Sequence, residues 1–119
     1  LMLKPQYEAI EPYERTEIEA AVQRNDPSEL LKVVLSVALH EEDREFAEAF
    51  CLRFAHHENF NVRGNAILGF GHIARLHGQL QEDVIKPLIL SRLNDESEYV
   101  RGHASDAKDD MEWFLKWRF

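Results

Sequence analysis

A five-residue motif, Val-Arg-Gly-x-Ala, occurs twice in this chain of 119 residues, at positions 62–66 and 100–104. A motif that recurs every 20–50 residues is typical of proteins that stack one supersecondary unit on the next. Glycine inside a helix costs up to about 1 kcal/mol relative to alanine. We therefore interpret both motif glycines as positions where two helices approach so closely that a Cβ would clash. The repeat therefore predicts that the two segments that carry the motif pack in equivalent ways. The residues that the two copies share are Val62, Arg63, Gly64, Ala66, Val100, Arg101, Gly102 and Ala104.

Apolar residues recur along the chain at helical spacing. No segment alternates apolar and polar residues between hairpin turns, as a half-buried strand does. Local signals mark helix ends: Asp26 and Pro27 suit the N-cap and first position of a helix, and Gly78 suits the position after a helix. We therefore expect an all-α fold of six helices with short links.

Two expected helices carry specific predictions about burial. Residues 41–57 have apolar side chains almost all around the helix, which is typical of a central buried helix. Those side chains are Phe46, Ala49, Phe50, Leu52 and Phe54. The last helix has an apolar stripe that we expect to face the core. The stripe consists of Val100, Ala104, Ala107, Met111, Phe114 and Arg118.

The motif and its interval resemble HEAT and HEAT-like repeats, in which the second helix of each pair begins with Val-Arg-x-x-Ala. The resemblance implies a short right-handed α-solenoid of about three helix pairs, at about 13–39, 42–77 and 79–116. It covers nearly the whole chain, so we expect one domain over residues 1–119. In such stacks one helix of each pair lines a concave binding face. The sequence leaves open which face is concave.

The resemblance also implies roles for the motif residues. The Val and Ala pack inward, and the Arg pairs with an acidic residue of a neighbouring repeat. Here the acidic residue expected just before the Val is displaced to Glu58 and Asp95. A third, degenerate copy follows Asp26, with Leu30 and Val34 in the places of the Val and Ala.

The charge of the chain limits its partners. It carries 22 acidic and 14 basic side chains, for a formal net charge of −8. Nucleic-acid binding requires a cationic surface that neutralises phosphates, and no basic cluster here is longer than two residues. A protein with a basic surface is therefore the expected partner, although acidity also serves solubility alone.

The cellular location follows from what the chain contains. Its single cysteine, Cys51, lies on an apolar helix face and suits a reducing compartment. The longest apolar run, residues 30–39, is too short to cross a membrane and contains Lys32. The first residues lack the pattern of a signal peptide. We expect a cytoplasmic protein with no membrane partner.

Catalytic motifs are weak in this chain. His40-Glu41 and His57-Glu58 resemble half of the four His-Glu pairs of HEAT-like di-iron hydroxylases, but they lie 17 residues apart and at helix ends, where the helix dipole favours histidine. No serine lies in a nucleophile elbow, and no glycine-rich loop follows a strand. We therefore expect no enzyme activity, no metal and no cofactor.

The last helix carries a second stripe about 100° from the apolar one. It contains His103, Asp106, Asp110, Trp113 and Trp117. Tryptophan is frequent at binding hot spots, and carboxylates pair with arginine and lysine. Alternatively, the two tryptophans cap the open end of the core, as terminal repeats require. Residues 95–112 hold seven acidic and two basic side chains, a net charge of −5.

Small, acidic, HEAT-like proteins resemble the immunity proteins of bacterial toxin systems, including contact-dependent growth inhibition (CDI). The resemblance implies a non-catalytic protein that binds and neutralises a basic, nuclease-type toxin. Two alternatives remain open: a scaffold or adaptor subunit of an assembly, and a His-Glu metalloenzyme. The oligomeric state is open, with a monomer favoured. The residues that we expect to bind the partner are His72, His103, Asp106, Asp109, Asp110, Glu112, Trp113 and Trp117.

Overall fold

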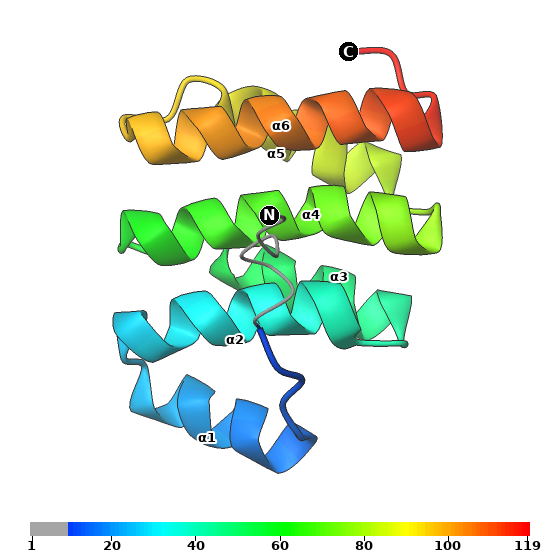
Figure 1. Ribbon diagram of the computed structural model, residues 1–119. Helices are drawn as coiled ribbons and strands as arrows, with labels where there is room; N and C mark the ends of the chain where they lie inside the picture. Colours follow the sequence, from blue (N-terminus) through cyan, green and yellow to red (C-terminus); the bar gives the residue numbers. More distant parts are fainter. Residues whose placement is uncertain (1–9) are drawn as a thin grey trace, which may run out of the picture.

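The computed structural model describes residues 10–119, and within this range the chain forms six α-helices and no strand (Figure 1). The all-α expectation is therefore confirmed for the described residues. The first nine residues of the expected domain lie outside them. The helices are α1 (Arg15–Arg24), α2 (Pro27–His40), α3 (Arg44–Phe54), α4 (Phe60–His77), α5 (Glu82–Arg92) and α6 (Glu98–Leu115).

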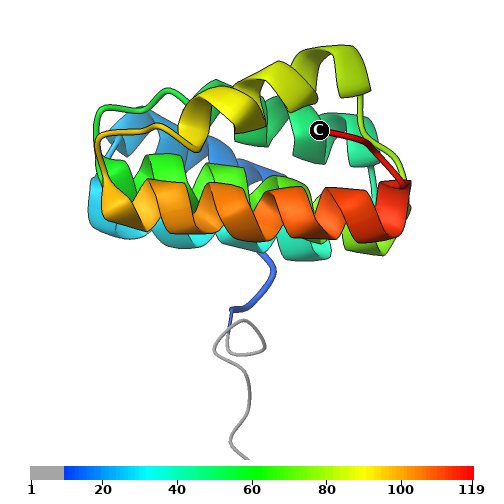
Figure 2. The same cartoon turned by 90° about the horizontal axis from the view of Figure 1, so that it is seen from above.

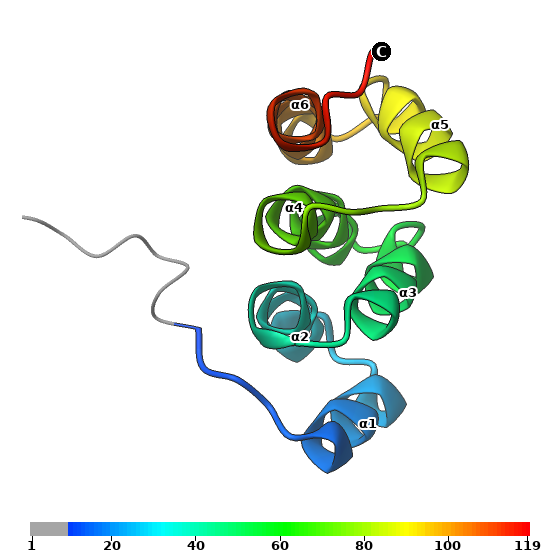
Figure 3. The same cartoon turned by 90° about the vertical axis from the view of Figure 1, so that its right-hand side faces the viewer.

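The helices form two layers (Figure 3). Helices α2, α4 and α6 lie side by side in one layer and run in the same direction, while α1, α3 and α5 form the other. Helix α4 is central, because it packs against α2 on one side and α6 on the other. The described part of the chain is thus a stack of three helix pairs, α1–α2, α3–α4 and α5–α6.

Side-chain caps mark the start of the second helix in each pair, which is α2, α4 or α6. Asp26 caps α2, which has Pro27 at its first position. Asn59 caps α4, and its side chain accepts hydrogen bonds from two backbone N–H groups of the first turn. The Ser97 hydroxyl caps α6 by accepting one hydrogen bond, from the Val100 backbone N–H at 3.4 Å. Helix α4 ends at His77, and the next residue, Gly78, has a φ of 66°, in the left-handed region that glycine adopts readily.

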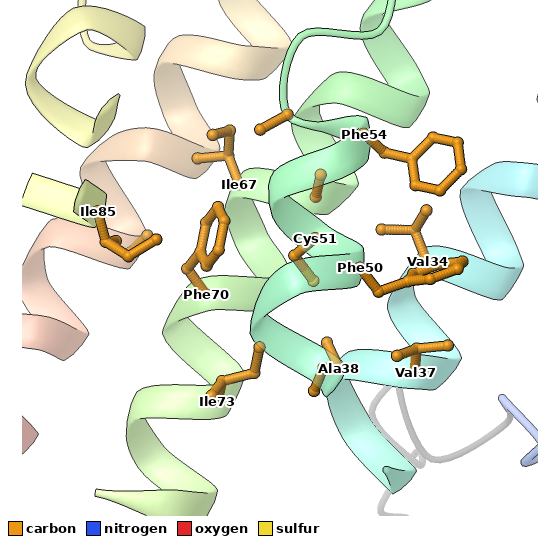
Figure 4. Close-up of a cluster of buried hydrophobic side chains, with 14 of the residues drawn as sticks. Val34, Val37, Ala38, Phe50, Cys51, Phe54, Ile67, Phe70, Ile73 and Ile85 are labelled. Carbon is orange, nitrogen blue, oxygen red and sulfur yellow. The ribbon is translucent and has the colours of Figure 1, made fainter. Parts of the chain in front are cut away.

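The motif residues build the core as the repeat predicts. The Val and Ala of each copy, and their counterparts in the degenerate third copy, are fully buried in one cluster. These residues are Leu30, Val34, Val62, Ala66, Val100 and Ala104. Helix α4 adds Ile67, Phe70 and Ile73, which lie in the same cluster as Phe50 and Cys51 of α3 (Figure 4). Cys51 is fully buried, and burial raises the pKa of its thiol to about 12.

The expectation that residues 41–57 form the central buried helix is wrong. Helix α3 lies in the layer of α1, α3 and α5, and it packs against α2 and α4 on one side. Ala49 is therefore exposed, and Phe46 and Leu52 are only partly buried. The Phe46 ring instead packs against the Arg15 guanidinium, whose carbon lies 3.5 Å from the ring centroid.

The predicted apolar stripe of the last helix is correct only as far as Met111. Its residues up to Met111 are fully buried, but Phe114 keeps 39% of its surface exposed. Helix α6 ends at Leu115 because Lys116 adopts a left-handed backbone conformation with a φ of 60°. Arg118 therefore lies beyond the helix and is exposed, so it is not part of a core-facing stripe.

The arginine of the first motif copy joins two neighbouring pairs of helices. Arg63 Nε and Nη2 each donate a hydrogen bond of 2.9 Å to the carboxylate of Asp95, which precedes α6. Arg63 Nη1 also donates to the backbone carbonyl of Glu58, at 3.2 Å. The displaced Asp95 is thus the acidic partner, while Glu58 takes part through its backbone. In the second copy, Arg101 donates to the Asp95 carbonyl at 2.7 Å.

The two motif glycines differ in their surroundings. A Cβ at Gly64 would lie 2.6 Å from ring carbons of Tyr99, so the expected clash is present there, and the group that needs the space is an aromatic side chain of α6. A Cβ at Gly102 would have no atom within 4 Å, so the expectation of a close approach is wrong at this position. Gly102 lies on the last helix of the stack, and no further helix pair packs beyond it among the described residues.

Candidate partner-binding surface

Close packing of α4 against α6 brings polar side chains of the two helices together. A Cβ at Gly71 of α4 would lie 2.7 Å from Asp110 Oδ2 and 3.3 Å from Ala107 Cα of α6. The absence of a side chain at Gly71 therefore lets the Asp110 carboxylate rest against the α4 backbone. We call the surrounding group the polar cluster. Its members are His72 and Arg75 of α4 and His103, Asp106 and Asp110 of α6.

Burial controls the charges in the polar cluster. Burial is the main reason why the pKa of His72 is lowered to about 4, and the nearby charges of Arg75 and His103 also lower this pKa. Arg75 Nη2 lies 3.2 Å from His72 Nδ1. Burial also lowers the pKa of His103, against the opposing effect of Asp106. Both histidines are therefore neutral at pH 7, and they do not offset the carboxylates beside them.

The carboxylates of α6 differ in exposure. Asp106 and Asp109 are exposed, whereas Asp110 is half-buried. Burial is the main cause that raises the pKa of Asp110; the positive charge of Arg75 opposes this shift, and Asp106 and Asp109 add to it. Helix α6 thus presents two exposed carboxylates, those of Asp106 and Asp109, beside the Asp110 carboxylate, which contacts α4.

Glu112 lies on another flank of α6. Its carboxylate accepts from Lys108 Nζ at 3.4 Å. Lys108 Nζ lies 5.5 Å from the centroid of the Phe119 ring, and Lys86 Nζ of α5 lies at the same distance from that ring. Glu112 therefore belongs to the side of α6 that faces the C-terminal residues and α5, and the structure does not bring it to the polar cluster.

The two predicted tryptophans have different environments. Trp117 is half-buried, packs against the core and lies beside Phe119, with 6.2 Å between the ring centroids. Trp113 is 69% exposed, and its main neighbour is Lys116, whose Nζ lies 5.0 Å from the ring. Trp117 thus covers the end of the core, while the Trp113 ring is available at the surface.

A groove that the sequence did not indicate adjoins the polar cluster. The segment of residues 10–14, which precedes α1, passes α2 on the side away from α3 and α5 (Figures 2 and 3). Ser36 Oγ of α2 donates to the Glu11 carbonyl at 2.7 Å, and His40 Nε2 lies 2.6 Å from the Ile10 carbonyl oxygen. These contacts make the segment one wall of a groove of about 570 Å³, whose other walls are α2, α4 and α6.

Mostly apolar side chains line this groove, which we call the apolar groove. They include Tyr13, Leu31, Leu35, Leu68 and Tyr99, with Asn65 at the centre of their polar contacts. Asn65 Nδ2 donates to the Leu31 carbonyl at 2.9 Å, and the Tyr99 hydroxyl donates to Asn65 Oδ1 at 2.5 Å. His103 lines the groove as well as belonging to the polar cluster, so the two features form one continuous surface.

The two His-Glu pairs are engaged in local structure. His40 contacts the Ile10 carbonyl, and His57 Nδ1 accepts from the Asn59 backbone N–H at 3.0 Å. Across residues 10–119, no three histidine, cysteine or acidic side chains gather as a metal site would require. In the same range, no helix has both the length and the apolar character to span a membrane.

These features define an all-α protein of three stacked helix pairs, with one layer that carries an apolar groove and exposed carboxylates. The same fold occurs in a chain from the crystal structure of a CDI complex from Cupriavidus taiwanensis LMG 19424. The match has a TM-score of 0.77 and 26% sequence identity, and covers 96% of this chain and 97% of that chain. No protein-family model and no curated protein matches the sequence.

Proposed function

We propose that this protein is an immunity protein that binds a bacterial toxin domain and neutralises it without catalysing a reaction. The observation that carries this proposal is the match to a chain of a CDI complex over almost the full length of both chains. A shared fold does not by itself determine function, so the proposal also draws on the exposed carboxylates of α6.

The proposed toxin has a basic surface, because the chain is acidic and its exposed carboxylates are grouped. The net charge is −8, Asp106 and Asp109 are exposed on α6, and the histidine beside Asp106 is neutral at pH 7. Carboxylates form short, charge-assisted hydrogen bonds with arginine and lysine. A nuclease uses such cations to hold phosphates, so covering them would stop its activity.

The proposal is tested by capture of the partner followed by a protection assay. The tagged protein is purified from its native cells, and a co-purifying basic protein is identified by mass spectrometry. That protein is then expressed with and without the proposed immunity protein, and surviving cells are counted. The test variant is Asp106→Lys/Asp109→Lys, since both side chains are exposed and their replacement leaves the core intact. Glu19→Lys/Asp83→Lys makes the same charge change on exposed sites of α1 and α5.

We expect the wild type and the Glu19→Lys/Asp83→Lys control to capture the basic protein and to restore growth. We expect the Asp106→Lys/Asp109→Lys variant to do neither. If the captured protein is not toxic, the immunity role is wrong, and a scaffold or adaptor role takes its place. If the test variant protects cells as well as the wild type does, the carboxylates of α6 are not the binding site.

A further inference from the structure

The apolar groove has the size and shape of a binding site. Its volume of about 570 Å³ lies within the range of roughly 300–1,000 Å³ that is usual for ligand sites. Leu31 and Leu35 of α2, Leu68 of α4 and Tyr99 of α6 supply its apolar walls. Tyr99 keeps 39% of its surface exposed, although it is a large aromatic residue next to buried leucines. A partner that filled the groove would remove this apolar surface from water.

The charges around the groove are distributed unevenly. Lys32 of α2 and Glu11 of the N-terminal segment both line it, and because both lie on its α2 side, their opposite charges offset each other. Across α4, on the opposite side, the lining residue is His103, which is neutral at pH 7. Its neighbour Asp106 is exposed and negative, so the net negative charge next to the groove lies on the α6 side.

We propose that the apolar groove takes an aliphatic or aromatic side chain of the basic partner, and that a lysine or arginine adjacent to it in the partner chain pairs with Asp106. This inference rests on the proposed function, because the basic partner comes from there. Charge complementarity sets the orientation: the cationic side chain points toward α6, away from Lys32. Protein interfaces commonly combine an apolar anchor that fills a pocket with polar and charged groups at the rim.

The inference is tested without the toxin, by selecting a random twelve-residue peptide library displayed on phage against the immobilised wild-type protein. The enriched peptides are synthesised, and their dissociation constants are measured by fluorescence anisotropy. Three variants are compared with the wild type. Leu31→Lys places an ammonium group in the apolar lining, and Asp106→Lys reverses the charge on the α6 side. Leu90→Lys makes the same leucine-to-lysine change on α5, where Leu90 is 43% exposed and far from the groove.

We expect enriched peptides to place an aliphatic or aromatic residue next to lysine or arginine. Their affinity should fall by about tenfold or more in Leu31→Lys and in Asp106→Lys, and should change by less than about twofold in Leu90→Lys. Asp106 is exposed, so its variant reports on binding even if Leu31→Lys perturbs folding. The inference is overturned if no peptide is enriched, if enriched peptides lack cationic residues, or if Asp106→Lys binds them unchanged. A wild-type dimer that Leu31→Lys dissociates would also overturn it, because a second copy would then occupy the groove.

Failure of this inference differs from failure of the proposed function. Peptides that bind in the groove, combined with no protection from any captured protein, would keep the groove and refute the immunity role. Protection without selective peptide binding would keep the immunity role and refute the groove as its anchor site.

Discussion

The ion pair between Arg63 and Asp95 offers a quantitative test of how the second and third helix pairs are held together. Both side chains are less than a tenth exposed, and two parallel hydrogen bonds of 2.9 Å join them. Arg63→Met keeps most of the side-chain volume but removes the charge. Asp95→Asn keeps the shape and one acceptor oxygen but removes the negative charge. The two changes thus remove each partner separately.

The size of the effect follows from what each change leaves unpaired. Loss of one partner of a buried ion pair costs about 3–5 kcal/mol. After Arg63→Met, Asp95 retains the Ser97 backbone N–H at 2.9 Å and Arg92 at 3.8 Å, so we expect a loss near the lower end, ~3 kcal/mol. After Asp95→Asn, Arg63 retains two backbone carbonyls, so we expect a loss of ~2 kcal/mol.

The double variant distinguishes coupling from independent damage. The double variant removes both charges, so no unpaired charge stays buried. The combined loss should then be ~3 kcal/mol rather than the sum of the two single-variant losses, which corresponds to a coupling energy of ~2 kcal/mol. The free energy of unfolding is measured by urea titration with far-ultraviolet circular dichroism and linear extrapolation. A coupling below ~0.5 kcal/mol would refute the reasoning, because neighbouring repeats would then be joined by apolar packing alone.

Two further predictions concern stability. Gly71→Ala should lower the free energy of unfolding by about 1–3 kcal/mol, because its Cβ would lie 3.3 Å from Ala107 Cα, and this backbone atom cannot rotate away as the Asp110 carboxylate can. Gly102→Ala should raise it by up to about 1 kcal/mol, because the site is open and alanine favours the helix; the opposite order in urea titrations would contradict both. The hydrogen bonds from Arg63 hold the pKa of Asp95 below its usual range. The stability that this carboxylate contributes is therefore fully present above its unfolded-state pKa of about 3.9. It is lost as the pH falls through the lower pKa of the folded state. The difference in unfolding free energy between wild type and Asp95→Asn should therefore stay constant from pH 7 to about pH 5 and shrink below about pH 4; a difference that grows on acidification would contradict this sign.

Much of the fold is predictable from the sequence because it depends on local signals. The caps at Asp26 and Gly78 mark helix ends through short-range hydrogen bonds and backbone preferences. Tertiary position is harder to predict. The apolar residues of α3 do not indicate how much of this helix its neighbours cover. Ala49 is exposed because it lies on a part of α3 that the other helices leave open. Lys116 adopts the left-handed conformation that ends α6, although no glycine in the sequence marks this position.

The same motif also behaves differently at the end of the stack. Gly64 faces Tyr99 of the next helix pair, whereas Gly102 has no neighbour within 4 Å. A sequence repeat predicts equivalent residues but not equivalent surroundings, because a terminal repeat lacks one of its neighbours.

The candidate site is predictable in part for the same reasons. Helical periodicity places His103, Asp106 and Asp110 on one face of α6, and the repeat interval of 38 residues indicates the equivalent positions of α4, such as His72 for Asp110. The close approach at Gly71 has no sequence signal. Nor has the apolar groove, because one wall is held to α2 by contacts between residues 25 and 30 positions apart, and the acceptors are backbone carbonyls.

That mode of attachment has a consequence for how related proteins diverge. Ser36 and His40 hold the N-terminal segment through the carbonyl oxygens of residues 10 and 11, which every amino acid possesses. Side chains at Ile10, Glu11 and Tyr13 line the groove without making these two attachments. Substitutions there reshape the groove while its wall stays anchored. On the proposed role of the groove, substitutions at Ile10 and Glu11 are therefore expected to alter the choice of partner while the two contacts that hold the wall stay in place.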